Sequence, residues 1–278
     1  MSTDWQPLSV RSGKREPDGP YEGMPIHLQH SVGEWLRGRF GWFKPGGGLN
    51  NDLMAQVAAS LRIPVQRTYK PGGISDQIFA AIEKDEDLYL DCLDATLHIS
   101  RGGSANTLSE ALRVGGSVWT VREDRRGLER RVSESTAASY SRSIQANDDS
   151  SNELKEAWAA VYGRNPNPSD AWDHAIKAIE DLLIPVITPK MIKANLGSVA
   201  GELKAHPELW TFGLPGNGER NNGETLEGLI RHIWPNPDRH GGSSKRAPTQ
   251  DEAEAAVQIA VLIVGICRDR LIKTHPGA

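Results

Sequence analysis

Cysteine is the scarcest informative residue in this sequence. The 278 residues contain only two, Cys92 and Cys267. Disulfide frameworks and cysteine-based zinc sites require more cysteines at closer spacing, so neither type of structure is supported. Each cysteine lies within an apolar helical pattern, which predicts a buried free thiol.

The sequence also lacks an apolar run long enough to cross a bilayer. The most apolar stretch, residues 255–267, falls short of the roughly 20 residues that a transmembrane helix needs. Gln258 and Gly265 interrupt it as well. The N-terminal residues have no apolar core of the kind found in a signal peptide. We therefore expect a cytoplasmic protein that makes no contact with a membrane.

An excess of positive charge is missing too. The chain has 32 Lys and Arg residues against 36 Asp and Glu, which gives a net charge of -4. A protein that coats nucleic acid is usually basic, so any contact with RNA is expected to be local and brief. The length allows one large domain or two ordinary ones. A hydrophobic content of 38% with 24% charged residues favours long loops over wholesale disorder.

Motifs for nucleotides and metals are not found. The glycine-rich stretch 41–48 has no apolar strand before it and no Gly-Lys-Ser/Thr ending, so it is interpreted as a flexible turn. His27 and His30 are one helical turn apart, but no further ligand completes a zinc site, so they are interpreted as surface or capping residues. The acidic side chains at 83–94 are interpreted as a solvated helix face. We expect no cofactor and no bound metal.

Helical periodicity is what the sequence does contain. In the first half, apolar residues recur at helical spacing in five segments, 24–40, 51–62, 74–81, 85–98 and 104–113. Residues 1–22 are predicted to form a flexible arm, and residues 23–147 a mostly helical N-terminal domain. The β-branched and aromatic stretch 117–121 predicts a short strand. The arginine-rich stretch 122–132 predicts a hydrated hinge or a second short strand, with contact to RNA as the alternative.

A polar segment at 147–152 suggests the boundary between the two domains. After it, helical patterns cover five further segments, 153–162, 170–183, 189–205, 226–233 and 249–273, and no convincing strand is found. This pattern predicts an antiparallel helical bundle over residues 148–278. The fold class is therefore expected to be mainly α.

A charged connection joins the last two predicted helices. Pro235 and Pro237 end the first of them, and the strongly apolar second helix is expected to be buried and to hold the connection in place. The candidate functional residues of this connection are Arg231, His232, Asp238, Arg239 and His240.

Histidine and arginine together permit one reaction that needs no metal, the attack of an RNA 2′-hydroxyl on its own phosphate. Histidine moves the proton, and arginine stabilises the charge that grows on the phosphate oxygens. His240 would be the acid and base, Arg231 and Arg239 would bind the phosphate, and Asp238 would orient one of the arginines. His232 points about 100° away from Arg231 on the helix, so it has a supporting role. The alternative interpretation is structural, because such clusters also serve as helix caps and ion pairs.

These residues resemble the C-terminal domain of abortive-infection proteins of bacteria and their phages, which belongs to the HEPN class of helical bundles. The resemblance covers roughly the last half of the chain. It includes residues 171–189, 196–203 and 238–242, and the alanine-rich helix that follows. The HEPN ribonuclease signature is an arginine, then four to six residues, then a histidine, and the spacing in this sequence is longer. His240 matches the histidine and Arg231 the arginine, with eight residues between them, and Arg239 is a second source of charge.

The resemblance implies a phage-defence protein with a HEPN-like bundle that cleaves RNA without a metal. It also implies a homodimer in which the two connections lie near each other. The alternative is a non-catalytic phage or prophage immunity factor, whose helical domain binds a phage or host protein. In that case the arginine–histidine connection is a structural ion-pair cluster.

Overall fold

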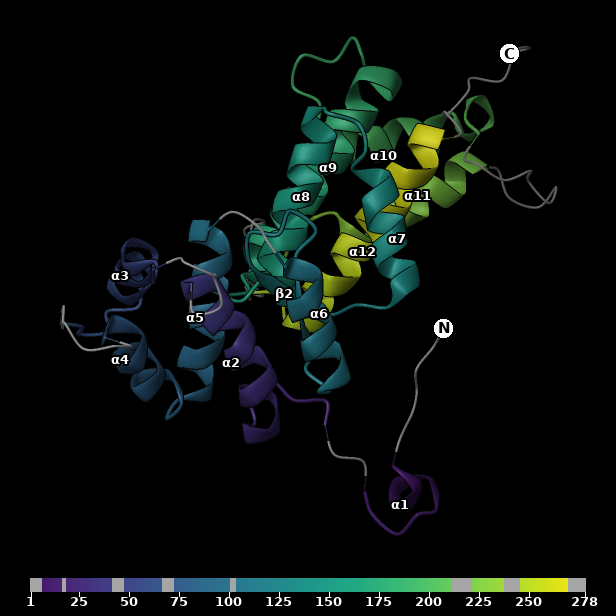
Figure 1. The fold of residues 1–278 in the computed structure, drawn as a ribbon. Coiled ribbons are helices and arrows are strands. Elements are labelled where there is room, and N and C mark those ends of the chain that lie inside the picture. Colours follow the sequence, from purple (N-terminus) through teal and green to yellow (C-terminus); the bar gives the residue numbers. More distant parts are fainter. Residues whose placement is uncertain are drawn as a thin grey trace. The chain divides into compact units, whose positions relative to one another are not determined.

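The computed structural model describes residues 7–16, 19–41, 48–66, 73–100, 104–211, 222–237 and 246–269. These residues form twelve α-helices, one 3-10 turn and two short strands, so the mainly α fold class is confirmed (Figure 1). The contacts divide the chain into two compact units, Met1–Arg131 (unit 1) and Val132–Ala278 (unit 2). The sequence had suggested a boundary some sixteen residues later, at 147/148.

Unit 1 contains the first six helices. Their bounds are α1 Leu8–Arg11, α2 Ile26–Phe40, α3 Asn51–Ser60, α4 Gly73–Ile82, α5 Glu86–Ser100 and α6 Ala105–Val114. The predicted helices of the first half match α2 to α6 to within two residues at each end, because the apolar spacing that predicted them also builds the core. In the segment predicted as a flexible arm, α1 is a single turn that buries no residue.

The core of unit 1 centres on α5. Leu90, Leu93 and Leu97 are fully buried on one face of this helix, at the spacing of an amphipathic helix. The hydroxyl of Tyr89 donates to the carbonyl oxygen of Gln29 at 3.0 Å, and burial raises the pKa of this phenol. Cys92 is buried here as predicted.

The two strands form an antiparallel hairpin after α6. They are β1 Trp119–Val121 and β2 Leu128–Arg130, with Thr120 opposite Glu129. These strands confirm the prediction at 117–121 and the second short strand within 122–132. The hairpin turn is fixed from α5, where a carboxylate oxygen of Asp94 accepts a hydrogen bond from the Leu128 backbone N–H at 2.6 Å.

Two arginines of the hairpin have their positive charge neutralised by nearby carboxylates. Arg122 contacts Asp124 at 2.9 Å, and Arg130 forms a two-pronged pair with Glu22. The pattern is that of a mixed surface rather than of a basic patch.

Unit 2 contains the remaining helices. They are α7 Glu134–Ser143, α8 Asp149–Tyr162, α9 Pro168–Ile187, α10 Leu196–Ala205, α11 Asn222–Ile233 and α12 Gln250–Asp269, with the 3-10 turn η1 Pro207–Leu209 before α11. Two long helices, α9 and α12, pack against each other, and the other helices of the unit pack around them.

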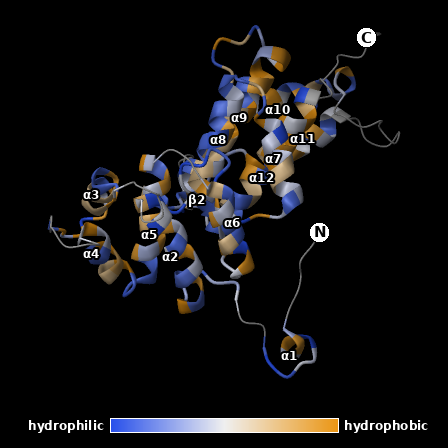
Figure 2. Ribbon diagram, viewed as in Figure 1, coloured by the Kyte–Doolittle hydropathy of each residue, from blue (hydrophilic) through white to orange (hydrophobic). Residues whose placement is uncertain are grey.

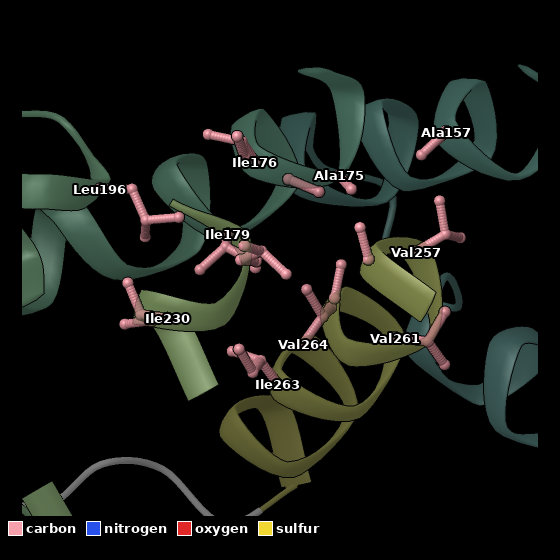
Figure 3. Packing of buried hydrophobic residues seen from close by; sticks show 14 of the residues in the cluster. Ala157, Ala175, Ile176, Ile179, Leu196, Ile230, Val257, Val261, Ile263 and Val264 are labelled. Carbon is pink, nitrogen blue, oxygen red and sulfur yellow. The ribbon is translucent and has the colours of Figure 1, made fainter. Parts of the chain in front are cut away.

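The core of unit 2 is formed mainly by alanine, valine, isoleucine and leucine side chains of five helices, together with several aromatic residues. Figure 3 shows Ile179 of α9 in the region between Ile230 of α11 and Val264 of α12. Ile179, Ile230 and Val264 are fully buried. Most of the apolar run at 255–267 is therefore buried or half-buried in this unit, with Ala255, Gln258 and Leu262 exposed, and Cys267 is buried as predicted. Along these helices, apolar and polar residues alternate in bands that follow the helical period (Figure 2).

Several helix bounds of unit 2 differ from the sequence prediction by four residues or more, and capping contacts explain two of them. The polar segment 147–152 is the start of α8, because the carboxylate of Asp148 accepts from the Ser151 backbone N–H at 2.8 Å and caps the helix. The helix predicted from 189 to 205 begins only at Leu196, and residues 188–195 form turns. The start is set by a capping box, in which the side chains of Asn195 and Ser198 each accept from the other's backbone N–H.

Candidate functional site

The candidate site is the α11–α12 connection, residues 234–249, together with the last turn of α11. Asp238, Arg239 and His240 lie outside the described residues. Arg231, His232 and both ends of the connection are described. The described part of the site therefore consists of the two flanks of the connection: the last turn of α11 with residues 234–237, and residues 246–249 with the start of α12.

Arg231 lies in the last turn of α11, and its side chain is 47% exposed. Its Nε donates to a carboxylate oxygen of Glu227, one turn earlier, at 2.9 Å. An exposed ion pair of this kind is worth about 0.2–1 kcal/mol, whereas a guanidinium can form two parallel charge-assisted bonds to a phosphate. The pair with Glu227 therefore orients the guanidinium and is weak enough to be exchanged for a phosphate. His232 is exposed beside it.

The first flank of the connection is held by α9. The indole N–H of Trp172 donates to the carbonyl oxygen of Ile233 at 2.7 Å, and this bond is buried. Asn236 is only 1% exposed, and its amide donates to a carboxylate oxygen of Asp173 at 2.7 Å. Two consecutive residues of α9 thus hold the chain at positions two and five residues after Arg231.

A close approach by α10 holds the same flank from another side. A Cβ at Gly197 would lie 2.6 Å from the indole nitrogen of Trp234, a distance that real Cβ atoms do not show. A side chain at position 197 would therefore displace the indole where the first turn of α10 meets this tryptophan.

The second flank is held by the start of α12. Arg246 makes two hydrogen bonds to the carboxylate of Glu252, at 2.6 and 2.5 Å. Glu252 also accepts from the Thr249 backbone N–H at 2.9 Å, while the Thr249 hydroxyl accepts from the Glu252 N–H at 3.3 Å. The pair with Arg246, joined by this capping contact, lowers the pKa of Glu252 to about 2. The first end of the connection is therefore held by side chains of α9, whereas the second is capped by contacts within residues 246–252.

A histidine that the sequence did not single out lies next to the first flank. His174 of α9 is half-buried, with Nδ1 2.5 Å from a carboxylate oxygen of Glu153 on α8 and Nε2 3.6 Å from one of Asp170. The signal in the sequence was the spacing of Asp170 and His174, four residues apart on one helix face. These contacts hold the ring against α8, directly after the Asp173 that anchors Asn236.

No group of three or more His, Cys, Asp or Glu side chains in the described part of the chain could hold a metal ion. Nε2 of His27 is 3.1 Å from the Gly115 carbonyl oxygen, and His30 is near Glu34. The two histidines contact different partners. Within the same described ranges, no helix has the length and apolar content needed to span a bilayer.

Comparisons with protein-family models, with curated proteins and with solved structures find no match to this chain.

Proposed function

We propose that this protein is a phage-defence protein of the abortive-infection type that cleaves RNA without a metal. Unit 2 would be its HEPN-like antiparallel bundle, and the α11–α12 connection its catalytic site. It would act in the cytoplasm as a homodimer. The resemblance of the last half of the chain supports this proposal. Within the structure, the supporting observation is the exposed guanidinium of Arg231 beside a connection whose two ends are fixed.

In the proposed reaction, His240 accepts the proton of a ribose 2′-hydroxyl while that oxygen attacks the neighbouring phosphorus. The bond from phosphorus to the 5′-oxygen breaks, and the leaving oxygen takes up a proton from the same imidazole. Arg231 and Arg239 bind the phosphate oxygens and stabilise their growing charge. Asp238 orients one of these arginines, and His232 supports the site. The products carry a 2′,3′-cyclic phosphate and a 5′-hydroxyl.

Fixed flanks favour such a reaction because catalytic groups must be held close to the productive geometry. The bonds from Trp172 and Asn236 restrict the first flank, and the pair between Arg246 and Glu252 restricts the second. In this proposal the flanks position the connection, and the residues between them carry out the cleavage of RNA.

The second candidate is a non-catalytic immunity factor that binds a phage or host protein through the helical unit. The contact between Arg231 and Glu227 favours it, because this arginine already has a carboxylate partner. The net charge of -4 also favours it over prolonged contact with RNA.

The test is cleavage of total cellular RNA by the purified full chain in the presence of a metal chelator. We expect fragments with 2′,3′-cyclic phosphate ends from the wild type. His240→Ala and Arg231→Ala should each lower the rate by about a hundredfold or more, the scale for loss of a charge-stabilising donor. Glu227→Gln should leave cleavage intact or raise it, because it releases Arg231.

His206→Ala is the matched control, since His206 is an exposed histidine of the same unit. If His240→Ala and Arg231→Ala cleave RNA as fast as the wild type, the catalytic proposal is refuted. The second candidate would be supported by a different result. The wild type would leave RNA unchanged and bind a host or phage protein, and the same substitutions would abolish this binding.

A further inference from the structure

The α9–α10 turn exposes apolar side chains that a folded chain normally buries. Ile192 is 98% exposed, Met191 is 51% exposed, and Val186 at the end of α9 is 45% exposed. Lys190 and Lys193 flank the first two and are also exposed. We call residues 189–193 the tip, which lies in the turn that follows α9 (Figure 1). The tip therefore combines an apolar centre with two positive charges.

A groove of opposite charge lies just before the tip in the chain. It has a volume of about 340 Å³ and is formed by the start of α8 and the last turns of α9. Its lining residues are acidic or apolar, apart from one serine: Asp148, Asp149, Ser150, Glu180, Asp181, Leu182, Ile184 and Pro185. We call it the acidic groove. Its volume is at the lower end of the roughly 300–1,000 Å³ typical of binding pockets, which suits a few side chains.

The negative charge of the acidic groove is only partly compensated. Arg268 forms a two-pronged pair with Asp148. Asp181, in contrast, faces Glu153, Asp149 and Asp148, with Lys177 as the opposing charge. The pKa of Asp181 is raised by burial first and then by these three carboxylates. A cation that entered the groove would relieve this repulsion.

The tip and the acidic groove are complementary in both charge and polarity. Lysines of the tip match Asp149 and Asp181, and Met191 and Ile192 match the apolar wall of Leu182 and Ile184. The tip does not fill the groove of its own chain, because Ile192 is almost fully exposed. We propose that the tip of one copy docks into the acidic groove of a second copy, and that the second tip docks reciprocally.

A reciprocal contact of this kind is what a two-fold dimer requires, since both surfaces are present on each chain. The tip follows the C-terminal end of α9, whereas the α11–α12 connection is anchored near its N-terminal end, at Trp172 and Asp173. These positions are separated by roughly 20 Å of helix, at 1.5 Å per residue. The proposed dimer contact therefore lies roughly 20 Å along α9 from the anchors of the connection. The contact does not depend on whether the connection cleaves RNA.

An anionic membrane is the other surface that could receive an apolar tip with flanking lysines. The acidic groove argues against it, because Asp149 and Asp181 would approach the same negatively charged surface. A second copy uses both features, whereas a membrane uses one and is repelled by the other.

The experiment is sedimentation velocity of the full chain over a range of concentrations. We expect a dimer for the wild type. Ile192→Asp should weaken it by about tenfold or more, equivalent to about 1.4 kcal/mol. Ile26→Asp is the matched control, because Ile26 is an isoleucine that is 85% exposed in unit 1. It should leave the dimer unchanged.

A charge exchange identifies the partner surfaces. The tip variant Lys190→Glu/Lys193→Glu and the groove variant Asp149→Lys/Asp181→Lys should each be monomeric, with unchanged helical content by circular dichroism. An equimolar mixture of the two should form a heterodimer, because each tip then meets a groove of opposite charge. The variant with all four substitutions should dimerise again and takes the place of the groove variant if that one does not fold.

Three outcomes would overturn the proposal. The first is a wild type that stays monomeric at all concentrations. The second is a dimer that Ile192→Asp and the charge variants do not weaken. The third is a monomer that binds phosphatidylserine vesicles and loses this binding with Ile192→Asp, which would assign the tip to membranes. None of these measurements uses RNA, so their outcome is independent of the test of RNA cleavage.

Discussion

The hydrogen bond between Asn236 and Asp173 makes the sharpest prediction about stability. Asn236 is buried at the first flank of the connection, and its amide donates to a carboxylate at 2.7 Å. Hydrogen bonds to charged groups contribute about 1.5–3 kcal/mol. We therefore expect Asn236→Ala to lower the free energy of unfolding of unit 2 by about 2 kcal/mol. With an m-value of about 2 kcal/mol/M, the urea midpoint should fall by about 1 M.

A double-mutant cycle isolates this contact. Asn236→Ala, Asp173→Ala and the double variant are unfolded in urea and followed by tryptophan fluorescence, to which Trp234 next to Asn236 contributes. The coupling energy between the two positions should be about 1–3 kcal/mol. Asn165→Ala is the control, because Asn165 is exposed in the α8–α9 turn. A coupling energy below about 0.5 kcal/mol would show that the bond does not hold the connection and would refute the reasoning.

Three further predictions concern other parts of the chain. Arg268 holds the pKa of Asp148 well below its usual range. The stabilisation from this pair is therefore present above the unfolded pKa of about 3.9 and is lost as the pH falls toward the lower folded value, and Asp148→Asn should reduce that acid-side loss in urea titrations between about pH 4 and pH 2. Asn195→Ala removes the acceptor that caps α10 and should cost about 1 kcal/mol, seen as a lower Tm. Burial raises the pKa of Cys92 and of Cys267 to about 12, so mass spectrometry should find both unmodified by iodoacetamide at pH 8 in the native protein and both modified in denaturant.

The sequence predicted the helices that bury a continuous apolar face. The helices α5 and α12 were predicted because leucines and valines recur at the helical period, and the same residues fill the two cores. The first strand was predicted from the β-branched stretch at 117–121, and a second strand was one of the alternatives for 122–132, but their pairing was not predicted. Such elements depend on local patterns, which a sequence shows directly.

The start of α10 was predicted seven residues too early because two signals compete. Thr188-Pro189 has the composition of an N-cap followed by a first-turn proline, and this favours a helix start. The capping box of Asn195 and Ser198 supplies two hydrogen bonds at a later position. Glu180 adds a third by accepting from the Leu196 backbone N–H at 2.7 Å. The last contact comes from another helix, so the sequence alone did not reveal which start would be used.

The sequence predicted where the candidate site lies in the chain, but not which residues of other helices hold it. The sequence showed two helices joined by a charged connection, and the structure describes both helices and both flanks. It did not show that Asn236 binds Asp173, because the two are 63 positions apart. It also did not show the polar cluster around His174, whose carboxylate partner Glu153 comes from a different helix. The roles of His240, Arg231 and Arg239 remain a proposal that RNA cleavage can test.

The close approach of Gly197 to Trp234 has a genetic consequence. A change of one nucleotide that turned this glycine codon into one for alanine would add a methyl group where the indole now lies. The Trp234 indole would have to shift at the residue that opens the α11–α12 connection. Position 197 carries no reactive group and lies on a different helix, so an inventory of the charged residues would pass over it. On the proposed function, loss-of-function alleles selected at random should nevertheless include this codon, because Trp234 opens the α11–α12 connection.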